Sequence, residues 1–300
     1  MSDIPRLNGA IRALEQGRPA FTAFATPEIG AAQLVNSAPF DAAVFDLEHH
    51  PYDVRTLRDC LQYMLNRAQI LRSGSPAPAV TPMVRIPANG AEMNEYLAKQ
   101  VLDIGVYGVI WPHVATVKEA HSAVAACRYA RPPSAPYHNP PGRRGDAPIF
   151  AAPYWGLTSQ QYYERADVWP LNPKGEILVG IMCEKVEAIR NLPKILDEVP
   201  GIGLVLIGEG DLSQELGFPR QYNHPALLSA IDDVLAVCIE KGVACGHPHV
   251  GTDNVEELLG KGFRWLMTAP TNSFTALEEG RRLSNRSDGG QRQPTGPAMT

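Results

Sequence analysis

Eight short apolar runs alternate along the chain with longer segments of helical periodicity, and this alternation constrains the fold most strongly. Most of the runs are rich in valine, isoleucine and leucine without polar alternation, as in strands covered on both faces. The predicted strands are Ala20–Ala25, Ala42–Leu47, Thr81–Ile86, Tyr107–Val114, Ile177–Cys183, Gly203–Gly208, Val243–Gly246 and Trp265–Thr268. Eight strand–helix units in about 280 residues favour a closed (β/α)8 TIM barrel of the α/β class over an open, doubly wound sheet.

Helical segments separate these strands. Val54–Leu71 places apolar side chains at a helical period, and an additional N-terminal helix, Leu7–Gln16, precedes the first strand. The other predicted helices are Ala91–Ile104, Val117–Tyr129, Val186–Val199, Pro225–Lys241, Asn254–Lys261 and Phe274–Leu283. No glycine-rich phosphate-binding motif follows any strand, which argues against a nucleotide-binding fold.

Two segments lie outside the repeat. Residues 131–176 form a long loop rich in proline, tyrosine and tryptophan, and loops of that length in a compact domain are usually functional or contact surfaces. Residues 284–300 are polar and rich in glycine and proline, as in a disordered tail. We therefore predict one barrel domain over residues 1–283, with the inserted loop 131–176, followed by a disordered tail.

Charge and cysteine content narrow the classes of partner. The net charge is −5 with both signs spread along the chain, so there is neither a basic nucleic-acid surface nor a polybasic membrane anchor. No apolar run approaches the roughly 18 residues of a membrane span, and the N-terminal segment lacks the apolar core of a secretory signal. The five cysteines are scattered without a CxxC pair, as in proteins with reduced thiols. We expect a cytoplasmic protein that binds neither nucleic acid nor membranes.

Reactive side chains gather where the predicted strands end, which is where the active sites of such barrels lie. In chain order these side chains are Asp46, Glu48, His49 and His50, then Arg85, His113, Glu184, Glu209 and Asp211, and finally His247 and His249. Glu184 and Asp211 end adjacent strands, and two converging carboxylates repel each other unless a cation or proton lies between them. An all-oxygen pair suits a hard divalent ion such as Mg²⁺ or Mn²⁺.

Other roles for the same residues remain open at this point. A strand-terminal carboxylate often caps a helix or forms a salt bridge, and Asp211 precedes a segment that it could cap. Arg85 offers a planar fork for a substrate carboxylate, and His49 has the chemistry of a general base. Purely structural roles are the alternatives for Arg85, His49, His50, His113, His247 and His249.

Five segments in fixed order carry a resemblance to a known family. They are "FDLEHHPYDVRTL", "MVRIP", "QVLDIGVYGVIWPHVATVKEA", "ILVGIMCEKVEAIRNLPKIL" and "LVLIGEGDLSQELGFP". These segments resemble the D-x-E-H, V-R-x-P, L-D-x-G, metal-Glu and G-P-x-D-L-S motifs of the HpcH/HpaI aldolases, the metal-dependent class II pyruvate aldolases. The resemblance covers about Phe21 to Leu283.

The resemblance implies a metal and substrate site. Glu184 and Asp211 would bind the divalent metal, Mg²⁺ or Mn²⁺, with Co²⁺ or Zn²⁺ as alternatives. Arg85 would hold the pyruvate carboxylate and oxygen. The backbone N–H groups of Gly210 and Asp211 would receive the carboxylate. The substrates would be small 2-oxo acids and aldehydes.

The resemblance also implies the groups that move protons. His49 would be the base, acting through a metal-bound water, and Asp103 would pair with it, in the family often across a subunit interface. Asp46 would shape the aldehyde end. The family further implies a homo-oligomer with an exchanged C-terminal helix, often a hexamer built as a trimer of dimers.

The expected reaction is cleavage of 4-hydroxy-2-oxo acids to pyruvate and an aldehyde, or the reverse aldol addition, through a metal-stabilised enolate. Two departures from the family pattern alter the polarity of the site, because Met182 stands where glutamine is usual and "GEGD" puts Glu209 near the metal. Alternatives are an acyl-CoA lyase of the citrate lyase or malyl-CoA lyase kind, an oxaloacetate decarboxylase, and a non-catalytic protein that binds oxo acids.

Overall fold

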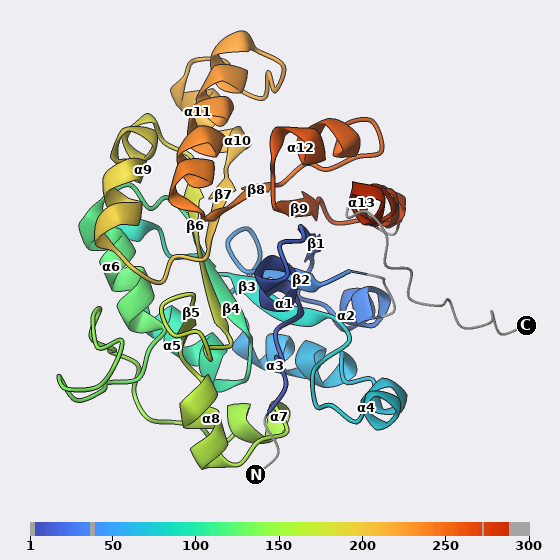
Figure 1. The fold of residues 1–300 in the computed structure, drawn as a ribbon, viewed down its shortest axis with the longest axis vertical. Helices are drawn as coiled ribbons and strands as arrows, with labels where there is room; N and C mark the ends of the chain where they lie inside the picture. Colours follow the sequence, from blue (N-terminus) through green and yellow to red (C-terminus); the bar gives the residue numbers. More distant parts are fainter. Residues whose placement is uncertain (1–3, 37–39, 272, 288–300) are drawn as a thin grey trace, which may run out of the picture.

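Eight parallel strands close into a barrel in the described part of the chain, and this confirms the predicted (β/α)8 fold (Figure 1). The computed structural model describes residues 4–36, 40–271 and 273–287. The barrel strands are β1 Ala20–Ala25, β2 Ala42–Asp46, β3 Thr81–Arg85, β4 Gly108–Trp111, β6 Ile177–Cys183, β7 Leu204–Ile207, β8 Ala244–His247 and β9 Trp265–Thr268. Pairing of β1 with β9 and of β4 with β6 closes the ring.

Apart from α1 Gly9–Glu15, which lies over the end of the barrel, the longer helices surround these strands (Figure 1). The other helices are α2 Ile29–Asn36, α3 Val54–Tyr63, α4 Arg67–Ser73, η1 Gly90–Glu92, α5 Glu95–Asp103, α6 Val117–Ala126, α7 Ala151–Tyr154, α8 Ser159–Arg165, α9 Val186–Glu198, α10 Glu209–Glu215, α11 Pro225–Lys241, α12 Val255–Lys261 and α13 Thr275–Ser287. The helix predicted over Val54–Leu71 is two helices, because the Asn66 side chain accepts the Gln69 N–H and starts α4 anew. The helices α2, α7, α8 and α10 were not predicted, and α7 and α8 lie in the segment that was predicted as a loop.

The barrel interior is filled by side chains, and α1 closes its amino end. Ile11 and Leu14 of α1 pack with inward-facing strand residues such as Val44 and Met83. The first residue of α1 donates its backbone N–H to Oγ1 of Thr81, which starts β3. A second, larger apolar cluster lies between the strands and the outer helices. Because the amino end is plugged, the carboxyl ends of the strands form the open mouth.

The inserted loop, residues 131–176, packs mostly at the plugged amino end, although Arg143 also reaches Glu95, the first residue of α5, with Nη1 2.6 Å from Oε1. It contains α7, α8 and a two-residue strand, β5 Val168–Trp169, that pairs with the start of β6. A buried ion pair joins Arg128 to Asp167, with Nε 2.6 Å from Oδ1. Glu176 accepts the backbone N–H of Leu7, and Arg165 at the end of α8 donates to the backbone oxygen of Pro5 in this N-terminal segment. Within one subunit the loop therefore contributes to the structure of the amino end and not to the candidate site.

The C-terminal boundary differs from the sequence prediction by four residues. The helix α13 continues to Ser287, so residues 284–287 are helical, and 288–300 lie outside the described residues. None of the helices that the structure describes combines the length and apolar character needed to cross a membrane. All five cysteines are buried as free thiols.

Candidate active site

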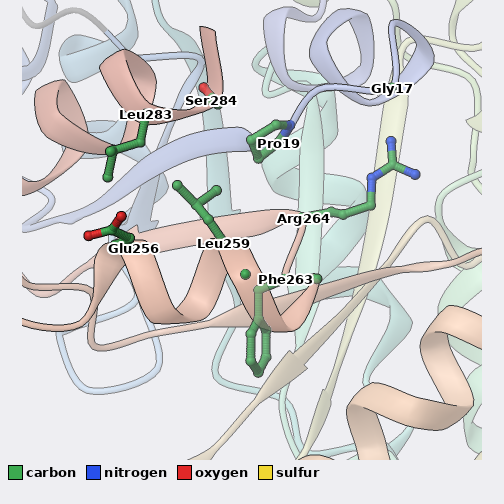
Figure 2. A pocket seen from close by; sticks show the side chains of 10 residues that line it. Gly17, Pro19, Glu256, Leu259, Phe263, Arg264, Leu283 and Ser284 are labelled. Atoms are coloured by element: carbon green, nitrogen blue, oxygen red, sulfur yellow. The ribbon is translucent and has the colours of Figure 1, made fainter. Parts of the chain in front are cut away.

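A cavity of about 260 Å³ opens at the carboxyl ends of the strands. Most of the residues predicted from the sequence line it, namely Asp46, His49, Arg85, Met182, Glu184, Glu209, Gly210, Asp211 and His249. A larger hollow of about 630 Å³ lies elsewhere, where α12 and α13 meet the loop before β1 (Figure 2). Its two charged side chains, Glu256 and Arg264, lie apart, so no group of reactive side chains converges there (Figure 2).

Arg85 is held rigidly by two carboxylates and an aromatic ring. Asp46 and Arg85 are paired residues of β2 and β3, and Nε donates to Asp46 Oδ1 at 2.9 Å. Nη1 lies 2.8 Å from Glu48 Oε2, and the guanidinium lies over the Phe24 ring at 4.7 Å. Burial opposes ionisation of Asp46, but the Arg85 guanidinium outweighs it and holds the pKa of Asp46 below its usual value. The fork is therefore fixed in orientation toward the cavity.

The two adjacent histidines occupy different places. His49 lies on the cavity wall with its side chain 65% exposed, and its Nε2 is 3.6 Å from Glu48 Oε2. His50 lies outside the cavity lining, with Nδ1 3.5 Å from Asp46 Oδ2. Of the two, His49 is the one that a molecule in the cavity can reach, and its catalytic role stays a prediction.

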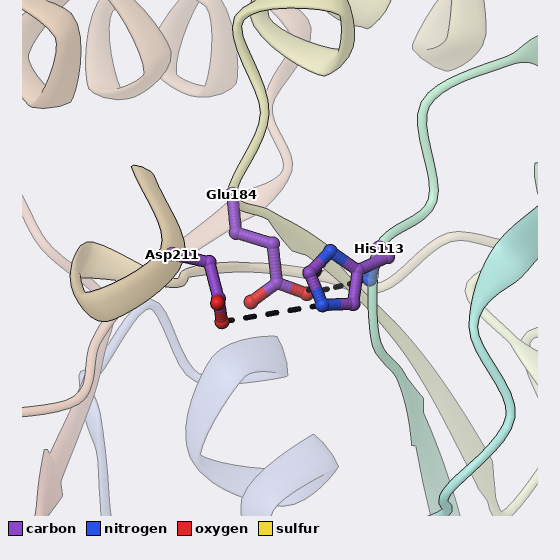
Figure 3. A group of neighbouring side chains, drawn as sticks. All are labelled: His113, Glu184 and Asp211. Atoms are coloured by element: carbon purple, nitrogen blue, oxygen red, sulfur yellow. Dashed lines mark hydrogen bonds and ion pairs between the residues drawn. The ribbon is translucent and has the colours of Figure 1, made fainter. Parts of the chain in front are cut away.

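Glu184, Asp211 and His113 form a group that fits a cation (Figure 3). One ligand atom from each lies within 4.8 Å of the others. Glu184 is 2% exposed, and its Oε1 accepts the His113 backbone N–H at 2.5 Å. Burial, together with the nearby carboxylates of Glu48 and Asp211, raises the pKa of Glu184 to about 8. A buried carboxylate beside a second one is a donor set that a divalent cation stabilises.

Gly208 leaves the room that Glu184 occupies. A Cβ added at Gly208 would lie 2.2 Å from Glu184 Oε2 and 2.4 Å from Glu184 Cβ. The backbone of Gly208 has φ −106°, which any residue adopts, so space and not conformation demands glycine here. The absence of a side chain at Gly208, directly after β7, thus leaves the space that Glu184, directly after β6, occupies.

Glu209 does not face the metal group, contrary to the expectation from "GEGD". Its Oε1 lies 2.8 Å from His247 Nε2 and its Oε2 lies 2.5 Å from His249 Nδ1. Because His247 Nδ1 accepts the His249 backbone N–H, its Nε2 carries the proton and donates to Glu209. Burial opposes ionisation of Glu209, but the two imidazole hydrogen bonds outweigh it and lower its pKa to about 2.

Asp103 is not brought to the cavity within the subunit. It ends α5, which leads from the mouth back to the amino end of β4. Arg144 Nη2 lies 2.9 Å from Asp103 Oδ1, and the same guanidinium lies over the Tyr129 ring at 4.4 Å. The pairing of Asp103 with His49 across a subunit interface stays a prediction.

Two polar cavity residues, beside several apolar ones, were missed by sequence reasoning. Arg220 and Tyr222 line the cavity from the connection between α10 and α11. Neither follows a predicted strand, so the strand-end rule that found the other residues could not find them. The His113 side chain was found by that rule, but its place beside Glu184 and Asp211 was left open.

Comparison with known proteins agrees with the fold and with the order of the motifs. Residues 22–271 match the family profile described as HpcH/HpaI aldolase/citrate lyase. The chain is 34% identical over 206 residues to a pyruvate aldolase of Rhizobium etli, covering 68% of each chain. It is 32% identical over 217 residues to a 4-hydroxy-2-oxo-heptane-1,7-dioate aldolase of Salmonella arizonae, covering 72% of this chain and 70% of that protein.

A solved structure has the same fold. The crystal structure of an HpcH/HpaI aldolase/citrate lyase family protein from Burkholderia cenocepacia superposes with a TM-score of 0.72 at 23% identity, covering 93% of this chain and 98% of that one. The aldolase names of the curated relatives support lyase activity for this chain. The profile match spans most of the barrel, and the chain belongs to the HpcH/HpaI aldolase/citrate lyase family.

Proposed function

We propose that this protein is a divalent-metal-dependent pyruvate aldolase that cleaves, or forms by aldol addition, 4-hydroxy-2-oxo acids. The observation that carries the proposal is the convergence of Glu184 and Asp211 with the fixed guanidinium of Arg85 on one cavity. Curated relatives with aldolase names support the same reaction class.

Glu184 and Asp211 would hold the cation, Mg²⁺ or Mn²⁺ in the first instance and Co²⁺ or Zn²⁺ as alternatives. When bound there, such a cation polarises the carbonyl of a 2-oxo acid and stabilises negative charge on its oxygen. Glu184 is the better fixed of the two ligands, since its Oε1 is already held by a backbone N–H.

Arg85 would bind and orient the 2-oxo acid. Its Nε and Nη1 are engaged by Asp46 and Glu48, which leaves Nη2 without a hydrogen bond among the described residues. The first-turn backbone N–H groups of Gly210 and Asp211 lie across the cavity, where they would receive the substrate carboxylate. Substrate would thus lie between β3 and β7.

His49 would move the proton. In cleavage it takes the proton of the 4-hydroxyl group, the C3–C4 bond breaks, the aldehyde leaves, and the electron pair passes to the enolate, which is protonated at C3 to give pyruvate. Asp46, which anchors Arg85, would shape the aldehyde end of the cavity. Because the His49 side chain is 65% exposed in the single chain, a neighbouring subunit could supply Asp103 as its partner in a homo-oligomer, for which we propose a hexamer.

The test is pyruvate release from a panel of 4-hydroxy-2-oxo acids, with and without a chelator, and after Mg²⁺ or Mn²⁺ is restored. We expect turnover that the chelator abolishes and the metal restores, and that Glu184→Gln removes. Glu187→Gln, an exposed glutamate on the same β6–α9 segment, is the matched control and retains turnover. Oxaloacetate and malyl-CoA in the same panel separate the decarboxylase and acyl-CoA lyase alternatives, and binding of pyruvate without turnover of any substrate would indicate a non-catalytic protein.

A further inference from the structure

We propose that His113 is a third ligand of the cation, so that the site binds metal through one imidazole nitrogen and two carboxylates. The inference rests on the proposed function, because it concerns the same cation. It extends that function by ranking the candidate metals, because an imidazole ligand favours Co²⁺ and Zn²⁺ over Mg²⁺.

The backbone directs His113 into the site. The strand β4 ends at Trp111, and His113 follows Pro112 with φ 52°, in the left-handed region, which is uncommon for residues other than glycine although asparagine, aspartate and histidine adopt it more often than the rest. A histidine in this conformation costs on the order of 1–3 kcal/mol, and such strain concentrates at functional sites. Here it aims the backbone N–H at Glu184 and the ring toward Asp211 (Figure 3).

The ring atoms are arranged as those of a ligand. Nδ1 is buried without a hydrogen-bond partner and lies 3.6 Å from Glu184 Oε1. Nε2 lies 4.0 Å from Asp211 Oδ2. A proton on Nδ1 would face the carboxylate oxygen that already accepts the His113 backbone N–H, which leaves the Nε2 lone pair facing Asp211.

The spacing is close to what a shared cation requires. Two ligand atoms at about 2.0–2.2 Å from one ion, at tetrahedral or octahedral angles, lie roughly 3.0–3.5 Å apart. The gap of 4.0 Å between Nε2 and Asp211 Oδ2 therefore closes with a small side-chain rotation. Asp211 has freedom for this, because its side chain is 46% exposed. Glu184 offers Oε2, since Oε1 is occupied.

If His113 supplies a nitrogen ligand, removing it should weaken the binding of some metals much more than that of others. Mg²⁺ binds oxygen ligands and retains water, so it gains little from imidazole, whereas Co²⁺ and Zn²⁺ bind imidazole well. His113→Asn is the sharpest variant, because asparagine tolerates the left-handed backbone and keeps the N–H donated to Glu184. We expect it to weaken Co²⁺ and Zn²⁺ binding at least 100-fold and Mg²⁺ binding less than about 3-fold.

The experiment is calorimetric titration of the full chain with Co²⁺, Zn²⁺ and Mg²⁺ separately, joined to pulsed EPR of bound Mn²⁺. We expect the EPR signal of wild type to show coupling to an imidazole nitrogen, and we expect His113→Asn to lose this coupling. His121→Asn, a histidine of α6 away from the cavity, is the matched control and behaves as wild type. Thermal unfolding verifies that each variant is folded.

Each outcome of these measurements supports or overturns His113 as a ligand. Selective loss of Co²⁺ and Zn²⁺ affinity together with loss of nitrogen coupling supports the third ligand. Equal affinities in wild type and His113→Asn, or an equal loss for all three metals, overturns it and leaves Glu184 and Asp211 as the metal site. If wild type binds none of the metals, the proposed function fails as well.

Discussion

Gly208→Ala tests how the backbone between β7 and α10 positions Glu184. The new Cβ would lie 2.2 Å from Glu184 Oε2 and 2.4 Å from Glu184 Cβ, whereas ordinary contacts begin near 3.4 Å. Each of these Glu184 atoms must therefore retreat by about 1 Å. The carboxylate oxygen can rotate away, but the Cβ atom is fixed to β6, so the strand end itself must shift.

The shift is large on the scale of a metal–ligand bond. Carboxylate oxygens bind divalent cations at about 2.0–2.6 Å, so a displacement of about 1 Å removes Glu184 as a ligand. We expect metal affinity to fall at least 100-fold, which corresponds to about 2.7 kcal/mol. The overpacking itself should lower the free energy of unfolding by about 1–3 kcal/mol.

The assay is calorimetric titration with Mn²⁺ beside urea unfolding. Gly210→Ala is the matched control, because a Cβ there meets no atom within 4 Å, and its metal affinity and stability should stay near wild type. A folded Gly208→Ala protein with wild-type Mn²⁺ affinity would refute the assignment of Glu184 as a ligand.

Three further substitutions test the other parts of the cavity. Arg85→Lys should abolish inhibition by pyruvate in a turnover assay. The planar guanidinium can bind Asp46 and a substrate carboxylate at the same time, and the single ammonium of lysine cannot. His49→Ala should lower kcat by roughly 10²–10⁴-fold with unchanged metal affinity. His50→Ala should lower kcat far less, unless its native mass also falls because the oligomer dissociates. If His50→Ala loses more activity than His49→Ala while staying assembled, the roles of the two histidines are exchanged. Glu209→Gln should lower the free energy of unfolding by about 1–3 kcal/mol in urea titration, because an amide cannot accept from both imidazoles, and an unchanged value would contradict the hydrogen-bond assignment.

The barrel was predictable because its buried strands are continuous apolar runs in the sequence. The strands β1, β6 and β9 have the predicted bounds, and β2 and β3 each end one residue early. All five are buried almost throughout, so apolar runs without alternation mark them. The short strand β5 was missed, because long-range contacts such as the Arg128–Asp167 ion pair hold the loop that contains it.

Local sequence explains why two of the unpredicted helices, α10 and α2, were missed. The helix α10 begins at Glu209, directly after the Gly208 that follows β7, so no loop residues separate helix from strand. Its sequence carries Gly210 in the first turn, which lowers the helical signal. The helix α2 likewise contains Gly30 and has no acidic residue in its first turn. Sequence patterns mark helices by caps and periodicity, and α10 has no side-chain N-cap.

The strand-end rule found the site, and pairing along the sheet explains why it worked. Asp46 and Arg85 are register partners on adjacent parallel strands, so their side chains were bound to meet at the mouth. The rule fixes the neighbourhood of a residue and not its orientation. For that reason neither this rule nor the "GEGD" motif could show that the Glu209 side chain turns toward β8 and away from the metal group.

The opposite orientations of Glu209 and Asp211 follow from helix geometry and decide where charge remains in the cavity. Residues two apart on a helix point about 200° apart, so Glu209 turns to the imidazoles of β8 while Asp211 faces Glu184. Among the described carboxylates of the cavity and its rim, Asp46 and Glu48 share Arg85, and Glu209 holds two histidines. Glu184 and Asp211 instead face each other and His113, without an arginine or lysine bonded to either. Glu184 and Asp211 are therefore the two facing carboxylates whose mutual repulsion a divalent cation would relieve, and they are the two that we propose as its ligands.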